Sequence, residues 1–309
     1  MPSSGTTPDL FNQEESVEVK KKPLSHWILP YLGLLGGVLA LSLSAIFIRQ
    51  AQAPSTVTTF YRMTFASLFL LPFFIRSARQ ENWSGGLHWL PLAMLGGLLT
   101  AFDHGSWSLA LESTNVANAT LFNNMAPVWV ALVAFFIWKE KLSGKFWLGL
   151  LLTMGGASFI LGSQMAGGDG LNKGDMIGVL SSLFYAGYFL ITQRVRVHFR
   201  TLTYVWLVAF TASLVLLVFN LVVGRPLSGF SPETYMVFVA AALVSQVGGY
   251  FSVAYALGHL PAAVVAPTMI LQPVITALLA IPLAGESLST GQIIGGAAVL
   301  AGIYLINRK

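Results

Sequence analysis

Two oppositely charged side chains, Arg62 and Asp103, lie inside long apolar stretches of this 309-residue chain. A charge at the centre of a lipid bilayer costs about 3 kcal/mol or more, so such residues usually have a partner or a function. Each lies roughly 5 Å from the middle of its stretch, toward the same side. This placement favours either a structural ion pair or a clamp for the ammonium and carboxylate of a zwitterionic molecule. A proton relay from Asp103 to the adjacent His104 is the third interpretation.

A pair of polar faces follows from helical spacing. Thr100, His104 and Trp107 recur at i, i+4 and i+7 and therefore share one face of a helix. An internal repeat with a constant offset of 146 residues places Gln246 and Tyr250 at the positions equivalent to Thr100 and His104. We predict that the two faces line a shared aqueous cavity and contribute to substrate binding. Interhelical hydrogen bonds, which are common in membrane bundles, are the alternative.

A second pair of polar faces joins the predicted binding residues. Asn118 and Phe122 share a face of one apolar stretch, and Thr268 and Gln272 share a face of another. The two stretches correspond to each other in the repeat, so their faces approach the same cavity from its two halves. We therefore include all four side chains among the predicted substrate contacts.

Two prolines, Pro127 and Pro273, occupy equivalent positions near the centres of these same stretches. A proline within a helix removes one backbone hydrogen bond and bends the helix. We predict a pair of symmetric hinges whose bend changes between two states of the protein. A static kink that aids packing is the alternative.

The composition assigns the elements that carry these residues to a membrane. Hydrophobic residues make up 55% of the chain and charged residues 9%, against about 25% charged in soluble domains. Each apolar stretch approaches the roughly 20 residues that a helix needs to cross the hydrocarbon core. The stretches cover about residues 27–48, 56–75, 88–111, 115–138, 145–162, 175–193, 201–223, 234–257, 261–283 and 288–306. We therefore predict an all-α membrane protein with ten transmembrane helices.

The basic residues indicate an orientation. If both termini lie inside, most Lys and Arg residues fall in the inner segments, whereas the outer connections hold Arg49, Lys173 and Arg225. This positive-inside pattern predicts a multi-pass protein of the cytoplasmic (inner) membrane with the N- and C-termini in the cytoplasm. The net charge of +5 then sets orientation, so we expect no nucleic-acid partner.

The repeat is predicted to be inverted. A proline and a glutamate recur at the offset of 146, as Pro127/Pro273 and Glu140/Glu286. Because the first half contains an odd number of predicted helices, five, the second half must enter the membrane from the opposite side. Inverted repeats of this kind build a central site in many transporters. The predicted organisation is a disordered cytoplasmic tail at 1–25, a five-helix repeat at 26–163, a linker at 164–174 and a second five-helix repeat at 175–307.

The repeat also carries a family resemblance. Its first copy contains Asn118–Ala119, Ala126–Pro127, Glu140–Lys141–Leu142, Gly149 and Gly156, and its second contains Gln272–Pro273, Gly285–Glu286, Gly295 and Gly302. This pattern resembles EamA-type proteins of the drug/metabolite transporter superfamily over about residues 27–306. The resemblance implies a ten-helix exporter of small metabolites, commonly amino acids. The aromatic-rich helices make the bacterial branch that exports aromatic and other neutral amino acids the preferred relative.

We therefore expect a monomeric carrier that exports a small-molecule substrate, an amino acid or a similar metabolite, by alternating access about a central cavity. Coupling to protons stays open. A passive channel-like facilitator, or a carrier for a different small metabolite, is the alternative. The sequence has no HExxH or GxSxG motif, its five histidines are dispersed and cysteine is absent, so we expect no catalysis, metal site or cofactor.

Overall fold

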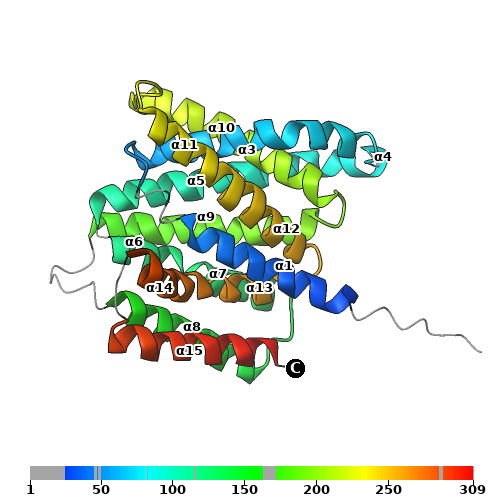
Figure 1. Cartoon of the computed structure of the whole chain (residues 1–309). Helices are drawn as coiled ribbons and strands as arrows, with labels where there is room; N and C mark the ends of the chain where they lie inside the picture. Colours follow the sequence, from blue (N-terminus) through cyan, green and yellow to red (C-terminus); the bar gives the residue numbers. More distant parts are fainter. Residues whose placement is uncertain are drawn as a thin grey trace, which may run out of the picture.

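The computed structural model describes residues 25–44, 47, 50–81, 83–114, 116–162, 172–284 and 288–308, and all regular structure in this part of the chain is helical. The long helices run roughly alongside one another, so that their ends gather at two opposite ends of the molecule (Figure 1). The tail predicted over residues 1–25 and the linker predicted over 164–174 lie almost wholly outside the described residues, as does Glu286.

The helical class predicted from the sequence is confirmed, whereas the number of ten spans stays a prediction. Eight described segments are long and apolar enough to cross a membrane, judged by length and composition. α1 forms a shorter apolar helix, and α5, which carries Asp103 and His104, falls outside the eight. The helical elements are α1 (Ser25–Ser42), α3 (Ser55–Ala78), α4 (Trp83–Gly86), η1 (Leu87–Trp89), α5 (Leu90–Ser113), α6 (Val116–Asn123), α7 (Ala126–Leu132), η2 (Val133–Ile137), α8 (Gly144–Gly162), α9 (Lys173–Val195), α10 (Thr201–Val223), α11 (Pro232–Ala241), η3 (Ala242–Tyr250), α12 (Phe251–Leu257), α13 (Ala262–Thr268), α14 (Leu271–Ala284) and α15 (Thr290–Asn307).

Side-chain caps mark the start of two of these helices. The Asn172 side chain accepts a hydrogen bond from the backbone N–H of Asp175, and the Asp175 carboxylate accepts one from the backbone N–H of Asn172, each at 3.0 Å. Ser289 and Gln292 form the same reciprocal arrangement at the start of α15. Such capping boxes satisfy N–H groups that have no partner within the helix. They therefore fix where α9 and α15 begin.

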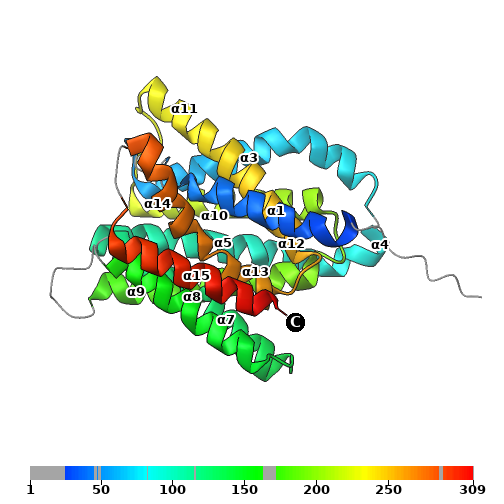
Figure 2. The ribbon, with the colours of Figure 1, turned by 60° about the horizontal axis from the view of Figure 1, so that its bottom comes forward.

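The helices α8 and α15 occupy equivalent places in the two repeats and pack directly on each other (Figures 1 and 2). A Cβ atom built on Gly149 would lie 2.6 Å from the carbonyl oxygen of Gly302, and one built on Gly156 would lie 2.5 Å from that of Gly295. An early glycine of each helix thus faces a late glycine of the other. The two helices are antiparallel, and their backbones touch at a distance that only glycine permits.

The helices α3 and α10 form a second antiparallel pair of repeat equivalents. At one end, Thr56 Oγ1 donates a hydrogen bond of 2.7 Å to Asn220 Oδ1. At the other end, the hydroxyls of Ser77 and Thr203 lie 2.9 Å apart. The start of each helix therefore contacts the end of its equivalent. This is the packing that an inverted repeat requires.

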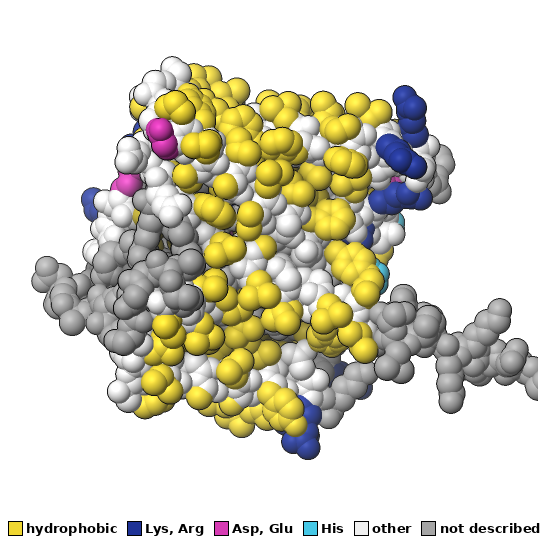
Figure 3. Space-filling model, in the orientation of Figure 1, with side chains coloured by type: hydrophobic (Ala, Val, Ile, Leu, Met, Phe, Trp, Pro, Cys, Tyr) yellow, Lys and Arg dark blue, Asp and Glu magenta, His cyan; other side chains and the backbone are white. Residues whose placement is uncertain are grey.

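Large apolar side chains cover the outside of the bundle between its two ends (Figure 3). Leu151 and Phe159 on α8 and Val222 on α10 are all more than 60% exposed. Charged groups gather at the ends, and most Lys and Arg side chains in view lie at the end where the C-terminus is found (Figures 1 and 3). There the Arg194 guanidinium stacks on the Trp138 ring at 4.3 Å. An apolar belt bounded by charge is a surface suited to a bilayer.

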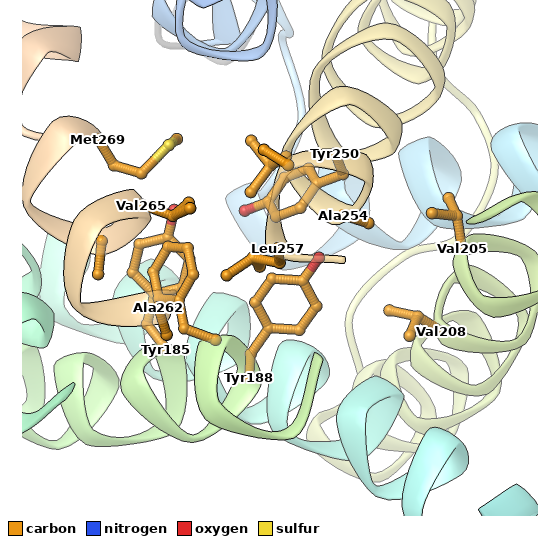
Figure 4. Close-up of a cluster of buried hydrophobic side chains, with 14 of the residues drawn as sticks. Tyr185, Tyr188, Val205, Val208, Tyr250, Ala254, Leu257, Ala262, Val265 and Met269 are labelled. Carbon is orange, nitrogen blue, oxygen red and sulfur yellow. The ribbon is translucent and has the colours of Figure 1, made fainter. Parts of the chain in front are cut away.

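An aromatic and aliphatic cluster built from α9, η3, α12 and α13 fills the interior of the bundle from Tyr250 toward the end that holds the C-terminus. Figure 4 shows Tyr188 of α9 beside Tyr250 of η3, with Tyr185 of α9, Val265 and Met269 on the other side of the cluster. The rings of Tyr188 and Tyr250 meet edge-on with centroids 5.9 Å apart. All five side chains are at most 9% exposed. This end of the protein is therefore packed in the state that the structure shows.

Three hydrogen bonds stabilise the end of the bundle that holds the C-terminus. The backbone N–H of Ala262 donates to Gln193 Oε1 at 2.7 Å, which joins α13 to α9. Arg196, just beyond α9, donates from Nε to the carbonyl oxygen of Ala254 at 3.1 Å and from Nη1 to that of Phe199. Burial lowers the pKa of the Arg196 guanidinium from its ordinary value. Its hydrogen bonds to two carbonyls offset part of the cost of burying the charge.

Candidate functional site

His104 of α5 and Tyr250 of η3 meet in the interior of the bundle. The His104 Nε2 and Tyr250 Oη atoms lie 3.4 Å apart, and the ring centroids are separated by 5.8 Å. The two residues are separated by 146 positions, the offset of the internal repeat. The structure thus brings a pair of repeat equivalents into direct contact, which places them on the axis that relates the two halves.

The Asp103 carboxylate is the centre of a buried hydrogen-bond network. Its Oδ1 atom accepts from Ser181 Oγ at 2.6 Å and from Asn123 Nδ2 at 2.9 Å, and its Oδ2 atom lies 3.1 Å from His104 Nδ1. Because the carboxylate is an acceptor, His104 donates from Nδ1 and holds a lone pair on Nε2. The Tyr250 hydroxyl then donates to His104. The network therefore joins α5, α6, α9 and η3 through one carboxylate.

The Arg62 guanidinium, on α3, makes a different set of contacts. Arg62 is 4% exposed, and its Nη1 atom donates to Ser44 Oγ at 3.1 Å. Its Nε and Nη2 atoms have no hydrogen-bond partner among the described residues. The neighbouring Met63 packs in one cluster with Ala101, so Arg62 and Asp103 lie at similar depth, as the sequence predicts.

An ion pair between Arg62 and Asp103 is nevertheless absent from the part of the chain that the structure describes. The interpretation of these two residues as a structural ion pair therefore does not hold for this state. The physical reason is that Asp103 is turned toward α6 and α9, whose side chains Asn123 and Ser181 donate to its Oδ1 atom, while His104 contacts Oδ2. Arg62 remains close enough to Asp103, Tyr185 and Tyr250 to interact with them electrostatically.

The other residues of the first pair of polar faces differ in their contacts. Thr100 donates to the carbonyl oxygen of Gly96 in its own helix at 2.8 Å. Trp107 lies half-buried on α5. Gln246, the equivalent of Thr100, is 0% exposed, and neither its amide oxygen nor its amide nitrogen has a partner within the described structure. Gln246 lies on η3, a π-helical segment, and such segments are often found at functional sites.

The second pair of polar faces contacts mainly the bundle itself. Asn118 Nδ2 donates to Asp175 Oδ1 at 3.1 Å, at the start of α9. Phe122 packs against Gly178, where an added Cβ would lie 3.0 Å from the Phe122 Cβ. Thr268 Oγ1 donates to Val264 O at 2.8 Å, and Gln272 Nε2 to Met269 O at 3.1 Å, both within the same span. Their role as substrate contacts stays a prediction.

The spans that contain Pro127 and Pro273 are both interrupted. α6 ends at Asn123 and α7 begins at Ala126, directly before Pro127. In the second repeat α13 ends at Thr268 and α14 begins at Leu271, two residues before Pro273. The breaks fall at equivalent places because each proline withholds an N–H from the preceding turn. The structure thus shows the symmetric interruptions, whereas their action as hinges stays a prediction.

Sequence reasoning missed several side chains that surround this centre, namely Ser44, Ser181 and Tyr185. Ser44 and Tyr185 are separated by 141 residues, the offset that relates Gly37 to Gly178 in the first helices of the two repeats. Extending that offset past these glycines would have marked both as counterparts near the axis. Ser181 has no such signal, because a single serine in an apolar helix is too common to single out.

The fold and this centre together define a class of protein. The protein is a helical bundle with an apolar belt, and its two equivalent halves meet around buried polar side chains. This architecture is typical of secondary transporters. The chain belongs to the EamA-like transporter family, which matches residues 28–162 and 172–308. The two matches correspond to the two repeats. It is therefore a multi-pass membrane transporter.

Individual relatives agree with this family. The chain is 26% identical to an uncharacterized transporter of Archaeoglobus fulgidus over 269 residues, 86% of this chain and 91% of that one. It is 35% identical over 86 residues, 28% of this chain, to a protein of Pseudomonas fluorescens named as a probable 4-amino-4-deoxy-L-arabinose-phosphoundecaprenol flippase subunit. A solved crystal structure superposes with a TM-score of 0.74 at 18% identity, covering 90% of this chain and 96% of that one. That likeness concerns the fold alone.

Proposed function

We propose that this protein is a secondary transporter that exports small metabolites, namely aromatic or neutral amino acids, across the cytoplasmic membrane. The observation that carries the proposal is the contact between the repeat equivalents His104 and Tyr250, next to buried polar atoms of Arg62 and Gln246. Polar groups buried at the interface of two repeats are where transporters of this architecture bind their substrates. The cluster of aromatic rings beside them supplies an apolar surface for an aromatic side chain.

The proposed mechanism is alternating access about this centre. The C-terminal end of the bundle is packed by Tyr188, Leu257 and Val265 (Figure 4). The paired interruptions before Pro127 and Pro273 supply equivalent points of bending in the two halves. In the opposite state, the second half would take the conformation now held by the first. The packing at the C-terminal end would then open.

The orientation proposed from the sequence is compatible with this mechanism. Basic side chains gather at the end that holds the C-terminus, which supports placing both termini in the cytoplasm. The two helices that would complete ten spans are α1, a shorter apolar helix, and the 24-residue α5. On this orientation the closed end faces the cytoplasm.

Reconstitution of the purified chain into proteoliposomes tests the proposed function. Uptake of labelled phenylalanine, tyrosine, leucine, alanine and a non-amino-acid control metabolite would be measured with empty vesicles as the blank. Saturable uptake of at least one aromatic or neutral amino acid is the expected result. If none is transported or competes, the amino-acid assignment falls, although the family assignment stands.

The alternatives are a channel-like facilitator and a carrier for another small metabolite. Transport rates distinguish a channel-like facilitator from a carrier. Flux through a channel does not saturate at millimolar substrate and does not respond to substrate on the far side of the membrane. A proton gradient imposed across the same vesicles tests coupling. Acceleration of uptake that is lost on collapsing the gradient would show that protons are co-transported.

A further inference from the structure

The guanidinium of Arg62 is a buried charge that no described acidic side chain contacts. Two acidic residues are buried in the described structure, Asp103 and Asp175. Asp103 accepts hydrogen bonds from Ser181, Asn123 and His104. Asp175 lies in the cap of α9, where it accepts from Asn118 and from neighbouring groups. The positive charge of Arg62 is therefore not neutralised by direct contact.

The two free nitrogen atoms of Arg62 have a specific geometry. Nη1 is occupied by Ser44 Oγ, whereas Nε and Nη2 have no partner. Nε and Nη2 lie along one edge of the planar guanidinium, and their parallel N–H bonds match the two oxygens of a carboxylate. A buried charge of this kind is strongly unfavourable unless it is paired and hydrogen-bonded. This buried, unpartnered edge of the fork thus has the form of an anion-binding group.

The surroundings favour a ligand at the transport centre. Arg62 interacts electrostatically with Tyr250 and Tyr185, so its charged end lies beside the contact between the two repeats. α3 packs against η3, which carries Gln246 with both amide atoms unpartnered and fully buried. A guanidinium edge and a free amide on adjacent helices can together bind one small polar molecule.

We propose that the Nε/Nη2 edge of Arg62 binds the carboxylate of the transported molecule, and that the carboxylate is the group by which the protein selects its substrates. The inference rests on the proposed transport function and names the substrate class. Asp103 already accepts three hydrogen bonds from side chains of this chain, whereas the Nε/Nη2 edge of Arg62 has no partner among the described residues. We therefore expect binding to depend more strongly on the carboxylate of the substrate than on its amino group.

Analogues of one substrate test this proposal without altering the protein. Labelled phenylalanine binding to the full chain in detergent would be competed with 3-phenylpropanoate, which lacks the amine, and with 2-phenylethylamine, which lacks the carboxylate. We expect 3-phenylpropanoate to compete and 2-phenylethylamine to compete at least about tenfold less well, since a hydrogen bond to a charged group contributes that much affinity. Equal competition by the amine, or competition by the amine alone, would overturn the proposal.

Two substitutions at Arg62 give an independent measurement. R62K keeps the charge but loses the fork, and R62Q loses both; each should weaken phenylalanine binding about tenfold or more. R225K and R225Q are matched controls, because Arg225 pairs with Glu112 at 2.6 Å on the exposed surface. Elution as a single peak on size exclusion shows that each variant is folded. Folded R62K and R62Q that bind like the parent protein would refute the role of Arg62.

Failure of this proposal is distinguishable from failure of the proposed function. If the protein transports a small amine or a neutral molecule and no carboxylate, the carrier assignment survives and the Arg62 site falls. If no amino acid binds, acetate, lactate and benzoate are tested instead as probes of the bare carboxylate site, through their effect on the thermal stability of the protein. Absence of any effect of these acids on the thermal stability of the protein, in parent and R62Q alike, would also contradict the site.

Discussion

The close packing of α8 on α15 yields a sharp prediction, because adjacent glycines in α8 have opposite surroundings. A Cβ added at Gly156 would lie 2.5 Å from the carbonyl oxygen of Gly295 and 2.8 Å from the backbone nitrogen of Val299. A Cβ added at Gly155 would meet nothing within 4 Å. Both positions are helical, so replacement by alanine has the same intrinsic effect on the helix, a gain of up to about 1 kcal/mol.

The difference between the two alanine variants therefore isolates the helix contact. In G156A the backbones of α8 and α15 must move apart by several tenths of an ångström or more, along a contact that runs the length of both helices. Overpacking of this kind typically costs about 1–3 kcal/mol, and the obstacle here is backbone, which cannot rotate away. We expect G156A to lower the unfolding temperature in detergent and G155A to leave it unchanged or raise it.

The equivalent position in the second repeat provides a check. Gly302 corresponds to Gly156 by the offset of 146, and a Cβ there would lie 2.5 Å from the carbonyl oxygen of Gly149. G302A should therefore destabilise the protein about as much as G156A. Thermal unfolding would be followed by tryptophan fluorescence or by loss of the monodisperse peak on size exclusion. Equal stability of G155A and G156A would refute the antiparallel glycine contact and the symmetry inferred from it.

Further predictions concern the polar centre and the interrupted helices. P127A and P273A should each allow a more continuous helix and slow substrate exchange while leaving binding affinity within about twofold; unchanged exchange rates would show that the prolines are static kinks. D103N keeps one acceptor oxygen but loses the charge that orients His104, so we expect a loss of about 1–3 kcal/mol in stability; proton-driven flux that persists in this variant would exclude Asp103 as a site of proton coupling. The single variants H104A and Y250F and their double variant should show a coupling energy of about 0.5–1.5 kcal/mol in thermal unfolding; additive effects would mean that the two side chains do not interact.

The sequence predicted those features that depend on composition and on repetition. Apolar stretches near the length of the bilayer gave the helical class. Offsets shared by Pro127/Pro273 and by His104/Tyr250 identified residues that the structure places at equivalent or contacting positions. Offsets report symmetry, and a residue near a symmetry axis contacts its own equivalent. Helical spacing alone would have given the face of each residue but no partner.

The partners of the charged residues could not be predicted in the same way. Equal depth suggested that Arg62 and Asp103 pair, yet depth says nothing of the rotation of a helix about its axis. That rotation follows from packing, which turns Asp103 toward Ser181 and leaves Arg62 beside Ser44. The extent of α5 agrees with the stretch 88–111 expected from the sequence, yet α5 falls outside the eight segments judged apolar enough to span a membrane, because it carries polar residues of the centre. In both cases the sequence pattern gave the least information about residues that belong to the candidate site.

Exchange across the membrane tests the central claim most directly. Proteoliposomes would be loaded with unlabelled phenylalanine and diluted into a trace of labelled phenylalanine, with vesicles loaded only with buffer as the control. A carrier that alternates about one centre should concentrate the label inside the loaded vesicles, transiently and well above its level in the control. Label that merely equilibrates, at a rate independent of what the vesicles contain, would contradict alternating access.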